Sequence, residues 1–381
     1  MATKILLAGG YGQAGQMIAG YLLRERAEVE LTISGRNKEK AQETASQLQK
    51  AHPQSSISAL ALDLSDREAL KTALKGRQLF IAASSTISHT GIVAEACLDA
   101  GVDYYDIQLS APQKLEALRK LRPSIESEGR CFITDGGFHP GILAALGRYA
   151  ALQFDELHQA NIYVALRVDW NKMAVTPGTR DEFVEEFKTY SSKIFQGGQW
   201  ITPSFWKTYP YDFGQPIGRI SCAPMYFEEM TILPKATPGL QETGVFISGF
   251  NPVTDYLVLP LLLAGFRFLP ERWQSALVSL FWWSLRFCRP PFLARLVLDA
   301  AGLRQGASYT FQVQLSHPDG YVLTAIPVVA ALLQYLDGSA RKPGLWFQGE
   351  VVEPERFFRD VKRMGVSMKR IYEASGPQII Q

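Results

Sequence analysis

The chain has 381 residues, of which 47% are hydrophobic and 20% are charged. This composition is typical of a folded globular protein and excludes a disordered chain. At roughly 150 residues per domain, the length predicts two domains. Lys and Arg number 39 and Asp and Glu number 37, so the formal net charge is only +2. We therefore expect no nucleic-acid partner, because such proteins carry a basic patch.

The four cysteines indicate a reducing compartment. They are far apart and contain no C-x-x-C pair, which argues against a disulfide framework and against a zinc site, so no metal is expected. The apolar run Ile5 to Ala8 is too short for a signal peptide. The sequence thus predicts a cytoplasmic protein. The cysteines are Cys97, Cys131, Cys222 and Cys288.

The first third of the chain predicts an α/β domain. Short runs rich in Ile, Leu and Val alternate with longer polar, Ala-rich segments, as in βαβ units with a parallel sheet. A capping box, Ser65-Asp66-Arg67-Glu68, marks a helix start after the third run. Six strands are expected near residues 4–8, 29–33, 57–62, 79–83, 102–106 and 130–134. Together they predict a doubly wound Rossmann sheet over residues 1–136.

A second, α+β domain is expected over residues 137–325. Apolar and polar residues alternate from Ile162 to Val168, and again from Tyr309 to Leu315. The turn residues 317–320 predict a hairpin that returns through Tyr321 and Leu323. Pro327 predicts the first turn of a helix that runs to about Asp337. For the C-terminal segment, residues 326–381, one hypothesis is a return to the first domain.

The strongest motif is a glycine-rich turn. Gly10, Tyr11, Gly12, Gln13, Ala14 and Gly15 match G-x-G-x-x-G directly after an apolar strand and directly before a helix that runs to about Arg26. In this context the glycines allow the backbone to approach a pyrophosphate, which the free N–H groups of the helix N-terminus bind. The alternative is a glycine-rich turn without a nucleotide.

The end of the second strand favours NADP over NAD. NAD-binding proteins place Asp or Glu there, about 20 residues after the glycines, whereas this chain has Ser34, Arg36 and Asn37. Arg36 can bind a 2′-phosphate while Ser34 donates its hydroxyl. The alternative is that Arg36 is a solvated charge at a helix start.

Further candidates for cofactor binding follow the third and fourth strands. Asp63 can reach the adenine, although it can equally belong to the start of the next helix. Ala83, Ser84 and Ser85 lie where ligands bind in open α/β sheets, or else cap the following helix.

A second glycine-rich element, residues 134–141, follows the sixth strand and opens a helix from about Ile142. Its His139 is the one catalytic candidate, because both forms of an imidazole exist near neutral pH. A structural histidine is the alternative.

With these residues in view, the sequence resembles the saccharopine dehydrogenase-like oxidoreductases. The resemblance rests on the run GGYGQAG, on residues 91–106, and on GFHPG at 137–141; residues 323–327 and 341–344 are similar to distant bacterial members. It implies an NAD(P)-binding domain followed by an α+β domain that builds the substrate site and often mediates dimerisation. The family commonly has Asp at the position of His139, so this chain departs from the family's pattern there and the resemblance implies no role for His139.

The resemblance implies an NADPH-dependent reductase that transfers hydride to a C=N or C=C bond of a small or partly hydrophobic substrate, and a homodimer. Two alternatives stay open. One is an NADP-binding scaffold without turnover, because the sequence shows no obvious Ser-Tyr-Lys or His-Asp catalytic set. The other is a lipid-pathway enoyl reductase at the membrane surface.

Residues 256–301 form an unusual apolar stretch, expected to be helical. Prolines and charged residues break it into runs shorter than the roughly 20 residues that a membrane span needs. It is therefore a buried core hairpin, a dimer interface, or a surface for peripheral membrane contact. Trp282 and Trp283 with nearby arginines suit the last of these.

Overall fold

The computed structural model describes residues 2–84, 86–172 and 184–374. The chain forms two compact units, each made of two segments. The first contains residues 1–145 and 321–364, and the second contains residues 146–320 and 365–381. The divisions differ from the borders expected from the sequence. The first of the three divisions lies within the helix α6 (Leu143–Ala151), the second lies at the start of α11 (Gly320–Leu336), and the third follows Met364.

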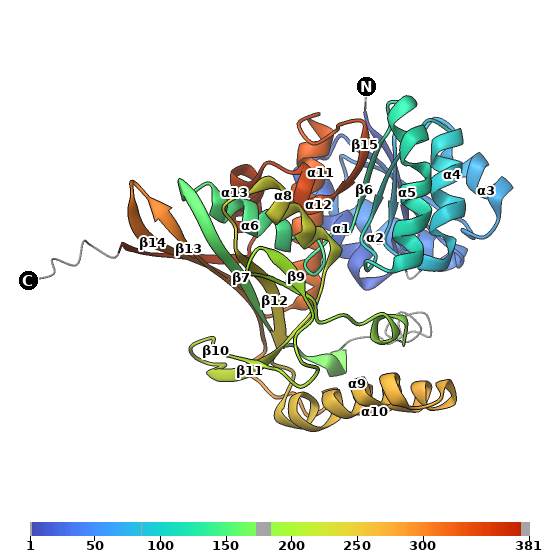
Figure 1. Cartoon of the computed structure of the whole chain (residues 1–381). Helices are drawn as coiled ribbons and strands as arrows, with labels where there is room; N and C mark the ends of the chain where they lie inside the picture. Colours follow the sequence, from blue (N-terminus) through green and yellow to red (C-terminus); the bar gives the residue numbers. More distant parts are fainter. Residues whose placement is uncertain (1, 85, 173–183, 375–381) are drawn as a thin grey trace, which may run out of the picture. The chain divides into compact units, whose positions relative to one another are not determined.

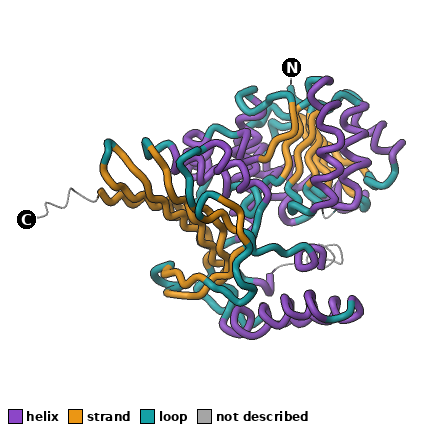
Figure 2. The backbone as a smooth tube through the Cα atoms, in the orientation of Figure 1, coloured by secondary structure: helices purple, strands orange, loops and turns teal. Residues whose placement is uncertain are grey.

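The first unit is built on a parallel sheet of seven strands among the described residues (Figure 2). Its order, β15-β6-β5-β4-β1-β2-β3, is the doubly wound order of a dinucleotide-binding fold with one strand added at an edge. The six expected strands are confirmed. The strands are β1 (Lys4–Ala8), β2 (Glu30–Gly35), β3 (Ser56–Ala61), β4 (Leu79–Ala82), β5 (Asp103–Asp106), β6 (Cys131–Thr134) and β15 (Gly344–Phe347).

Helices cover both faces of this sheet (Figure 1). On one face α3, α4 and α5 bury Leu70, Val93 and Leu118 against Leu6 and Phe80 of the strands. Right-handed crossovers place α1 and α2 on the opposite face. The helices are α1 (Gln13–Glu25), α2 (Lys38–Ala51), α3 (Arg67–Leu74), α4 (Thr90–Asp99), α5 (Pro112–Ser127), α12 (Gln348–Val351) and α13 (Pro354–Arg363), with α11 given above.

Two local expectations about helix starts are wrong. The cap of α3 is Asp66, not Ser65, because the Asp66 carboxylate accepts hydrogen bonds from the backbone N–H groups of Glu68 and Ala69. The helix α11 begins at Gly320 and contains Pro327 in its interior. Pro327 there costs one backbone hydrogen bond, and the almost complete burial of the helix offsets that cost.

The predicted hairpin is also misplaced. The strand β14 (Ala307–His317) pairs with β13 (Leu293–Arg304), which precedes it, and not with residues 321–323. Gln305 and Gly306 make the turn with positive φ at both positions. This pair of values matches a type I′ turn, whose twist suits antiparallel strands.

The second unit contains a mixed sheet of nine strands among the described residues. Seven of them follow the order β10-β11-β12-β7-β13-β14-β16, and the β8 to β9 pair joins at β12. Only β12 and β7 run parallel; the other pairs are antiparallel. The remaining strands are β7 (Glu156–Arg167), β8 (Ile194–Gln196), β9 (Gln199–Ile201), β10 (Tyr209–Asp212), β11 (Arg219–Pro224), β12 (Glu242–Ser248) and β16 (Ser367–Ala374).

The apolar stretch of the second unit is helical only in its first part. It forms η4 (Thr254–Val258), α9 (Leu259–Phe268), η5 (Glu271–Trp273) and α10 (Gln274–Leu285). Residues from Leu293 onward belong to β13, so the expectation of a helical stretch up to residue 301 is wrong. Among the described residues, none of the helices combines the length and the hydropathy that crossing a bilayer requires.

Candidate cofactor-binding site

The glycine-rich turn between β1 and α1 adopts the expected strand-turn-helix geometry. Gly9 has a φ of +76°, and a Cβ on Gly15 would lie 2.3 Å from the carbonyl oxygen of Gly9. Only glycine therefore lets the helix start so close to the turn. At the start of α1 the N-cap is Gly12, with no capping side chain and no acidic residue in the first turn. The helix N-terminus is suited to an anionic group such as a pyrophosphate.

Tyr11 joins this turn to the end of β2. Its ring lies against Gly35, where a Cβ would be 2.4 Å from Cε1 of the tyrosine. Its hydroxyl oxygen accepts a hydrogen bond from the backbone N–H of Asn37 at 3.3 Å. The first turn of α1 is bound to the glycine-rich turn as well, because Gln16 donates from Nε2 to the Tyr11 carbonyl at 2.8 Å. The two segments that flank the cofactor crevice thus hold each other in place.

The three candidates at the end of β2 have different roles. Arg36 is exposed and carries the only charge among the three. Asn37 caps α2, because its Oδ1 accepts from the N–H of Lys40 at 2.7 Å. Ser34 is fully buried and donates its hydroxyl to the carbonyl of Leu7 at 3.2 Å. A phosphate group can therefore be met by Arg36, whereas the hydroxyl of Ser34 is engaged inside the protein.

The candidates after β3 and β4 are held by local hydrogen bonds. The Asp63 carboxylate accepts from the backbone N–H and the hydroxyl of Ser65, which lower its pKa together with a smaller contribution from Arg36. Ala83 lies against Gly9: a Cβ added to Gly9 would lie 2.5 Å from the Ala83 carbonyl oxygen. The carbonyl of Ser84 accepts from Nε2 of Gln108 at 2.9 Å. Ser85 lies outside the described residues.

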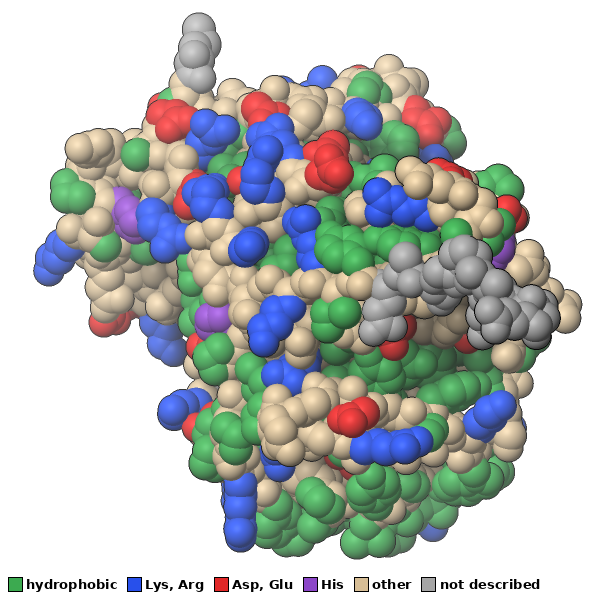
Figure 3. Space-filling model, turned by 90° about the vertical axis from the view of Figure 1, so that its left-hand side faces the viewer, with side chains coloured by type: hydrophobic (Ala, Val, Ile, Leu, Met, Phe, Trp, Pro, Cys, Tyr) green, Lys and Arg blue, Asp and Glu red, His purple; other side chains and the backbone are tan. Residues whose placement is uncertain are grey.

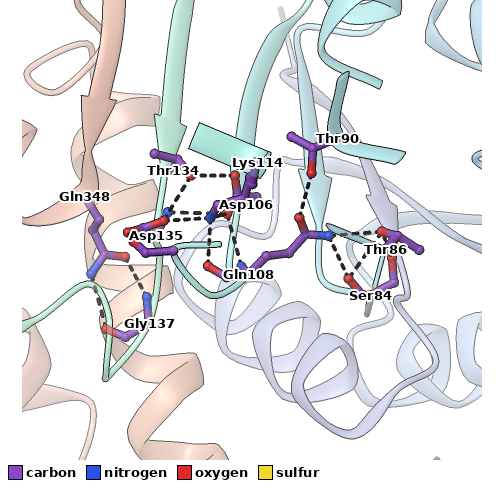
Figure 4. Close-up of polar contacts among 11 residues, drawn as sticks. Ser84, Thr86, Thr90, Asp106, Gln108, Lys114, Thr134, Asp135, Gly137 and Gln348 are labelled. Carbon is purple, nitrogen blue, oxygen red and sulfur yellow. Dashed lines mark hydrogen bonds and ion pairs between the residues drawn. The ribbon is translucent and has the colours of Figure 1, made fainter. Parts of the chain in front are cut away.

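A buried charged cluster lies at the same edge of the sheet (Figure 4). Nζ of Lys114 is 2.9 Å from Oδ1 of Asp106 and 2.6 Å from Oδ1 of Asp135, and it also donates to the carbonyl of Gln108 at 2.9 Å. Thr134 donates to Oδ2 of Asp106 at 2.7 Å. The three charged side chains are completely buried. Two carboxylates against one ammonium leave a surplus of negative charge in the protein interior.

Burial and the neighbouring charges shift the pKa values of the cluster. Burial raises the pKa of Asp135 to about 6, although the neighbouring Lys114 lowers it. For Lys114, burial lowers the pKa, but the two carboxylates outweigh burial and hold the pKa above its ordinary value. Ser110, which is half-buried, donates its hydroxyl to the second oxygen of Asp135. The cluster therefore keeps Lys114 charged and lets Asp135 take up a proton in mildly acidic solution.

The second glycine-rich turn starts at Asp135, whose φ is +59°. A Cβ on Gly141 would lie 2.5 Å from the backbone nitrogen of Gly137, so the turn folds tightly onto itself. Gln348 of α12 fixes it from the C-terminal segment, because its Oε1 accepts from the N–H of Gly137 at 3.2 Å (Figure 4). The same oxygen accepts from the hydroxyl of Tyr105.

His139 lies in this turn. Burial lowers its pKa to about 4, so the imidazole is neutral at physiological pH. With this pKa very little of the protonated form, which would donate a proton, exists near neutral pH. This favours a positioning role over the proton transfer expected from the sequence.

The sheet brings the predicted cofactor residues to one edge. β4, β1, β2 and β3 are neighbours in this order, and the predicted residues lie at or just after their carboxyl ends, where ligands bind in doubly wound sheets. Sequence reasoning did not find Gln108, Lys114 and Gln348. A signal existed for Lys114, which lies four residues before the buried Leu118 on the inward face of α5. No comparable pattern marks Gln348, because its partners are more than 200 positions away in the chain.

Comparison with known proteins supports the resemblance seen in the sequence. Residues 5–133 match the family described as the saccharopine dehydrogenase NADP binding domain. The chain is saccharopine dehydrogenase-like. It is an NAD(P)-dependent oxidoreductase, and the predicted cofactor, NADP(H), agrees with the NADP-binding domain.

One solved structure agrees with the fold over nearly the whole chain. Apo saccharopine dehydrogenase (L-Glu forming) from Saccharomyces cerevisiae superposes with a TM-score of 0.68 at 17% sequence identity, covering 98% of this chain and 100% of that chain. This confirms the predicted fold, a Rossmann domain with a second, mixed sheet domain. GenD2 from gentamicin A biosynthesis, in complex with NAD, matches less well, with a TM-score of 0.40 at 11% identity over 81% of this chain and 72% of that one.

The described residues at the end of β2 and at the start of α1 fit a nicotinamide dinucleotide. Within residues 2–84, 86–172 and 184–374, no three His, Cys, Asp or Glu side chains are grouped to hold a metal ion. The N-terminus of α1, which has no side-chain cap, and the cation at the end of β2 are the donors that a dinucleotide with a 2′-phosphate requires.

Proposed function

We propose that the protein is an NADPH-dependent reductase that acts on a C=N or C=C bond of a small or partly hydrophobic substrate. The observation that carries the proposal is the end of β2, where Arg36 is exposed and no carboxylate takes the position that NAD-binding proteins give to Asp or Glu. When bound, NADPH supplies a hydride to the carbon of that bond, and the electron pair of the bond takes up a proton.

Different residues of the first unit would bind different parts of the cofactor. The N-terminus of α1 binds the pyrophosphate, since its N–H groups have no side-chain cap. Arg36 binds the 2′-phosphate through charge-assisted hydrogen bonds. Gln108 and Gln348 hold the loops after β4 and β6, which border the crevice for the nicotinamide half. His139 and the buried cluster position the second loop.

A titration with both cofactors tests the cofactor part of this proposal. We expect NADPH to bind more tightly than NADH. An Arg36→Ala variant should lose roughly 10- to 100-fold in NADPH affinity, since a charge-assisted hydrogen bond contributes about 1.5 to 3 kcal/mol, while its NADH affinity stays the same. Lys75→Ala removes an exposed cation on the far end of α3 and serves as the matched control. Equal or tighter binding of NADH by the unmodified protein would contradict the proposal.

The reductase part is tested by NADPH oxidation. Candidate substrates fall into two classes: imines formed from an amine and an α-keto acid, and α,β-unsaturated acyl thioesters of increasing chain length. Consumption of NADPH with one class identifies the bond. Turnover that rises with acyl chain length favours the lipid-pathway enoyl reductase, an alternative supported by the exposed apolar side chains of the second unit. Tight NADPH binding without consumption with either class favours the non-catalytic scaffold.

A homodimer and a small-molecule substrate complete the proposal. Both come from the family to which the chain is similar, in which the second domain often mediates dimerisation. Sedimentation velocity of the purified protein measures the oligomeric state directly. A single monomeric species at micromolar concentration would contradict the dimer.

A further inference from the structure

The second unit concentrates exposed apolar side chains on one short segment. Of the 14 large hydrophobic side chains that are exposed among the described residues, nine lie between 253 and 287. This exceeds what scattered surface apolar residues explain. We call this group the apolar face. Its members are Val253, Tyr256, Leu257, Leu261, Phe268, Leu269, Trp273, Trp283 and Phe287.

Helical periodicity gathers these side chains into two stripes. Along η4 and α9, Val253, Leu257, Leu261 and Phe268 follow one another at intervals of four, four and seven, so they share one side of the helix. Trp273 is the N-cap residue of α10, and Trp283 and Phe287 lie four positions apart at the other end of that helix, where their rings are in contact. The two helices pack against each other. Hydrophobic side chains gather at the lower end of Figure 3, at the level of α9 and α10 in Figure 1.

The opposite sides of the same helices are already packed into the unit. Trp282 is only 9% exposed and contacts Trp170, while Phe281 contacts Phe250. Thr254 donates its hydroxyl to that of Ser284 at 2.9 Å, and this buried hydrogen bond ties η4 to α10. The inward sides of these helices therefore belong to the core of the second unit, whereas the outward sides do not. The outward stripes lie on helices that are held in place.

The charged residues of this segment are mostly cations. Arg267, Arg272, Arg286 and Arg289 are exposed, whereas Glu271 is the single exposed acidic residue between 253 and 289. Lys188 lies 3.7 Å from the Glu271 carboxylate and offsets its charge. Asp255 is turned inward and accepts a hydrogen bond from the backbone of Phe250. The surroundings of the apolar face are therefore positively charged.

We propose that the apolar face docks the protein onto the surface of a membrane that contains anionic lipid. Trp273 and Trp283 enter the headgroup region, where indole rings prefer to lie, and the arginines meet the lipid phosphates and carboxylates. A second copy of the chain fits less well. A two-fold contact through this face would bring the arginines of both copies together without enough acidic partners.

Co-sedimentation of the full chain with lipid vesicles tests the proposal. We expect the protein to pellet with vesicles of phosphatidylcholine and phosphatidylserine at low salt, to be released as salt is added, and to bind pure phosphatidylcholine weakly. A Trp273→Ser, Trp283→Ser double variant should bind at least about tenfold more weakly, because both indoles leave the interface. Leu152→Ser is the matched control, since Leu152 is 56% exposed in the same unit but outside the apolar face.

A second pair of variants tests the charge. Arg272→Gln with Arg289→Gln should weaken binding to the anionic vesicles roughly 30-fold, at about 1 kcal/mol for each cation near the surface. Lys50→Gln with Lys75→Gln changes the net charge equally at exposed positions of the first unit and should leave binding unchanged. Because these substitutions lie on the surface, their result can be interpreted even if the tryptophan variant does not fold.

Two results would overturn the proposal. One is a protein that stays in the supernatant with anionic vesicles at low salt. The other is equal pelleting of the unmodified protein and both variants of the apolar face. If the unmodified protein does not pellet but sediments as a dimer, and the tryptophan variant sediments as a monomer, the apolar face is a subunit contact. NADPH affinity is measured in parallel and should be the same in all these variants, since they leave the first unit's dinucleotide site intact.

Discussion

The ammonium group of Lys114 lies 2.6 Å from Oδ1 of Asp135, and both side chains are completely buried. Asp106 shares the same ammonium group at 2.9 Å. The pairs connect α5 with the ends of β5 and β6, so they also fix the turn that contains His139. Because charges in a protein interior are costly unless they are paired, each member of this cluster depends on the others.

Replacement of Lys114 by Met should strongly destabilise the protein. It leaves two buried carboxylates without a counter-charge, at an expected cost of about 3 to 5 kcal/mol in the free energy of unfolding. Urea denaturation measures the change. Lys120→Met, on the exposed side of the same helix, is the control and should cost less than about 1 kcal/mol. A Lys114→Met, Asp135→Asn double variant should recover part of the loss; equal stability of the single and double variants would argue against charge as the cause.

Asp135 should give the stability a specific pH dependence. Its pKa in the folded protein is about 6, above the ordinary value of 3.8. The folded state therefore binds more protons than the unfolded state between these values, so the contribution of Asp135 is present below about pH 4 and lost as the pH rises through 6. Asparagine removes this titration and accepts the positive φ.

We therefore expect the stability of Asp135→Asn relative to the unmodified protein to increase from pH 4 to pH 7, by up to about 3 kcal/mol. Thermal unfolding across this pH range measures it. Asp99→Asn, at an exposed carboxylate of α4, should show no such trend. A relative stability of Asp135→Asn that stays flat with pH would mean that Asp135 is ionised throughout.

His139 should affect turnover without setting the pH profile. Its pKa of about 4 lies below the ordinary value of 6.5, so it stays neutral across the working range. The contribution of its burial to stability is complete above about pH 6.5 and is lost as the pH falls toward 4. A His139→Asn variant should change kcat but keep the shape of its pH dependence between pH 6.5 and 8. If the substitution removed a pKa near 6.5 from that profile, His139 would be the proton donor.

Two glycines of α1 should respond differently to substitution by alanine. A Cβ on Gly15 would lie 2.3 Å from the backbone oxygen of Gly9, so Gly15→Ala must displace the turn. We expect its NADPH affinity to fall by about tenfold or more, since small displacements at such sites are costly. A Cβ on Gly20 meets nothing within 4 Å, and Gly20→Ala should stabilise the helix by roughly 0.5 to 1 kcal/mol. Isothermal titration with NADPH compares them; equal affinity in both variants would show that the turn tolerates the added methyl group.

Local patterns were sufficient for the first unit's sheet and its glycine-rich turn. Each of the six expected strands is a short apolar run between amphipathic helices, and the G-x-G-x-x-G spacing is a backbone requirement that neighbouring residues satisfy. The exposed Arg36 also follows from the chain alone, since it depends on its position after β2 and not on a distant partner.

The roles of residues whose partners are far away in the chain were decided only by the tertiary structure. Lys114 is a buried ion-pair partner only because β5 and β6 bring Asp106 and Asp135 to it, and Gln348 reaches Gly137 from the other end of the chain. The position of Pro327 inside α11 could not be predicted from the local sequence either, because burial of the whole helix outweighs the local preference of proline for a first turn. Trp282 and Trp283 are adjacent in sequence, yet the first is buried and the second is 49% exposed. Which side of a helix meets the core is set by the elements packed against it, and composition carries no record of that.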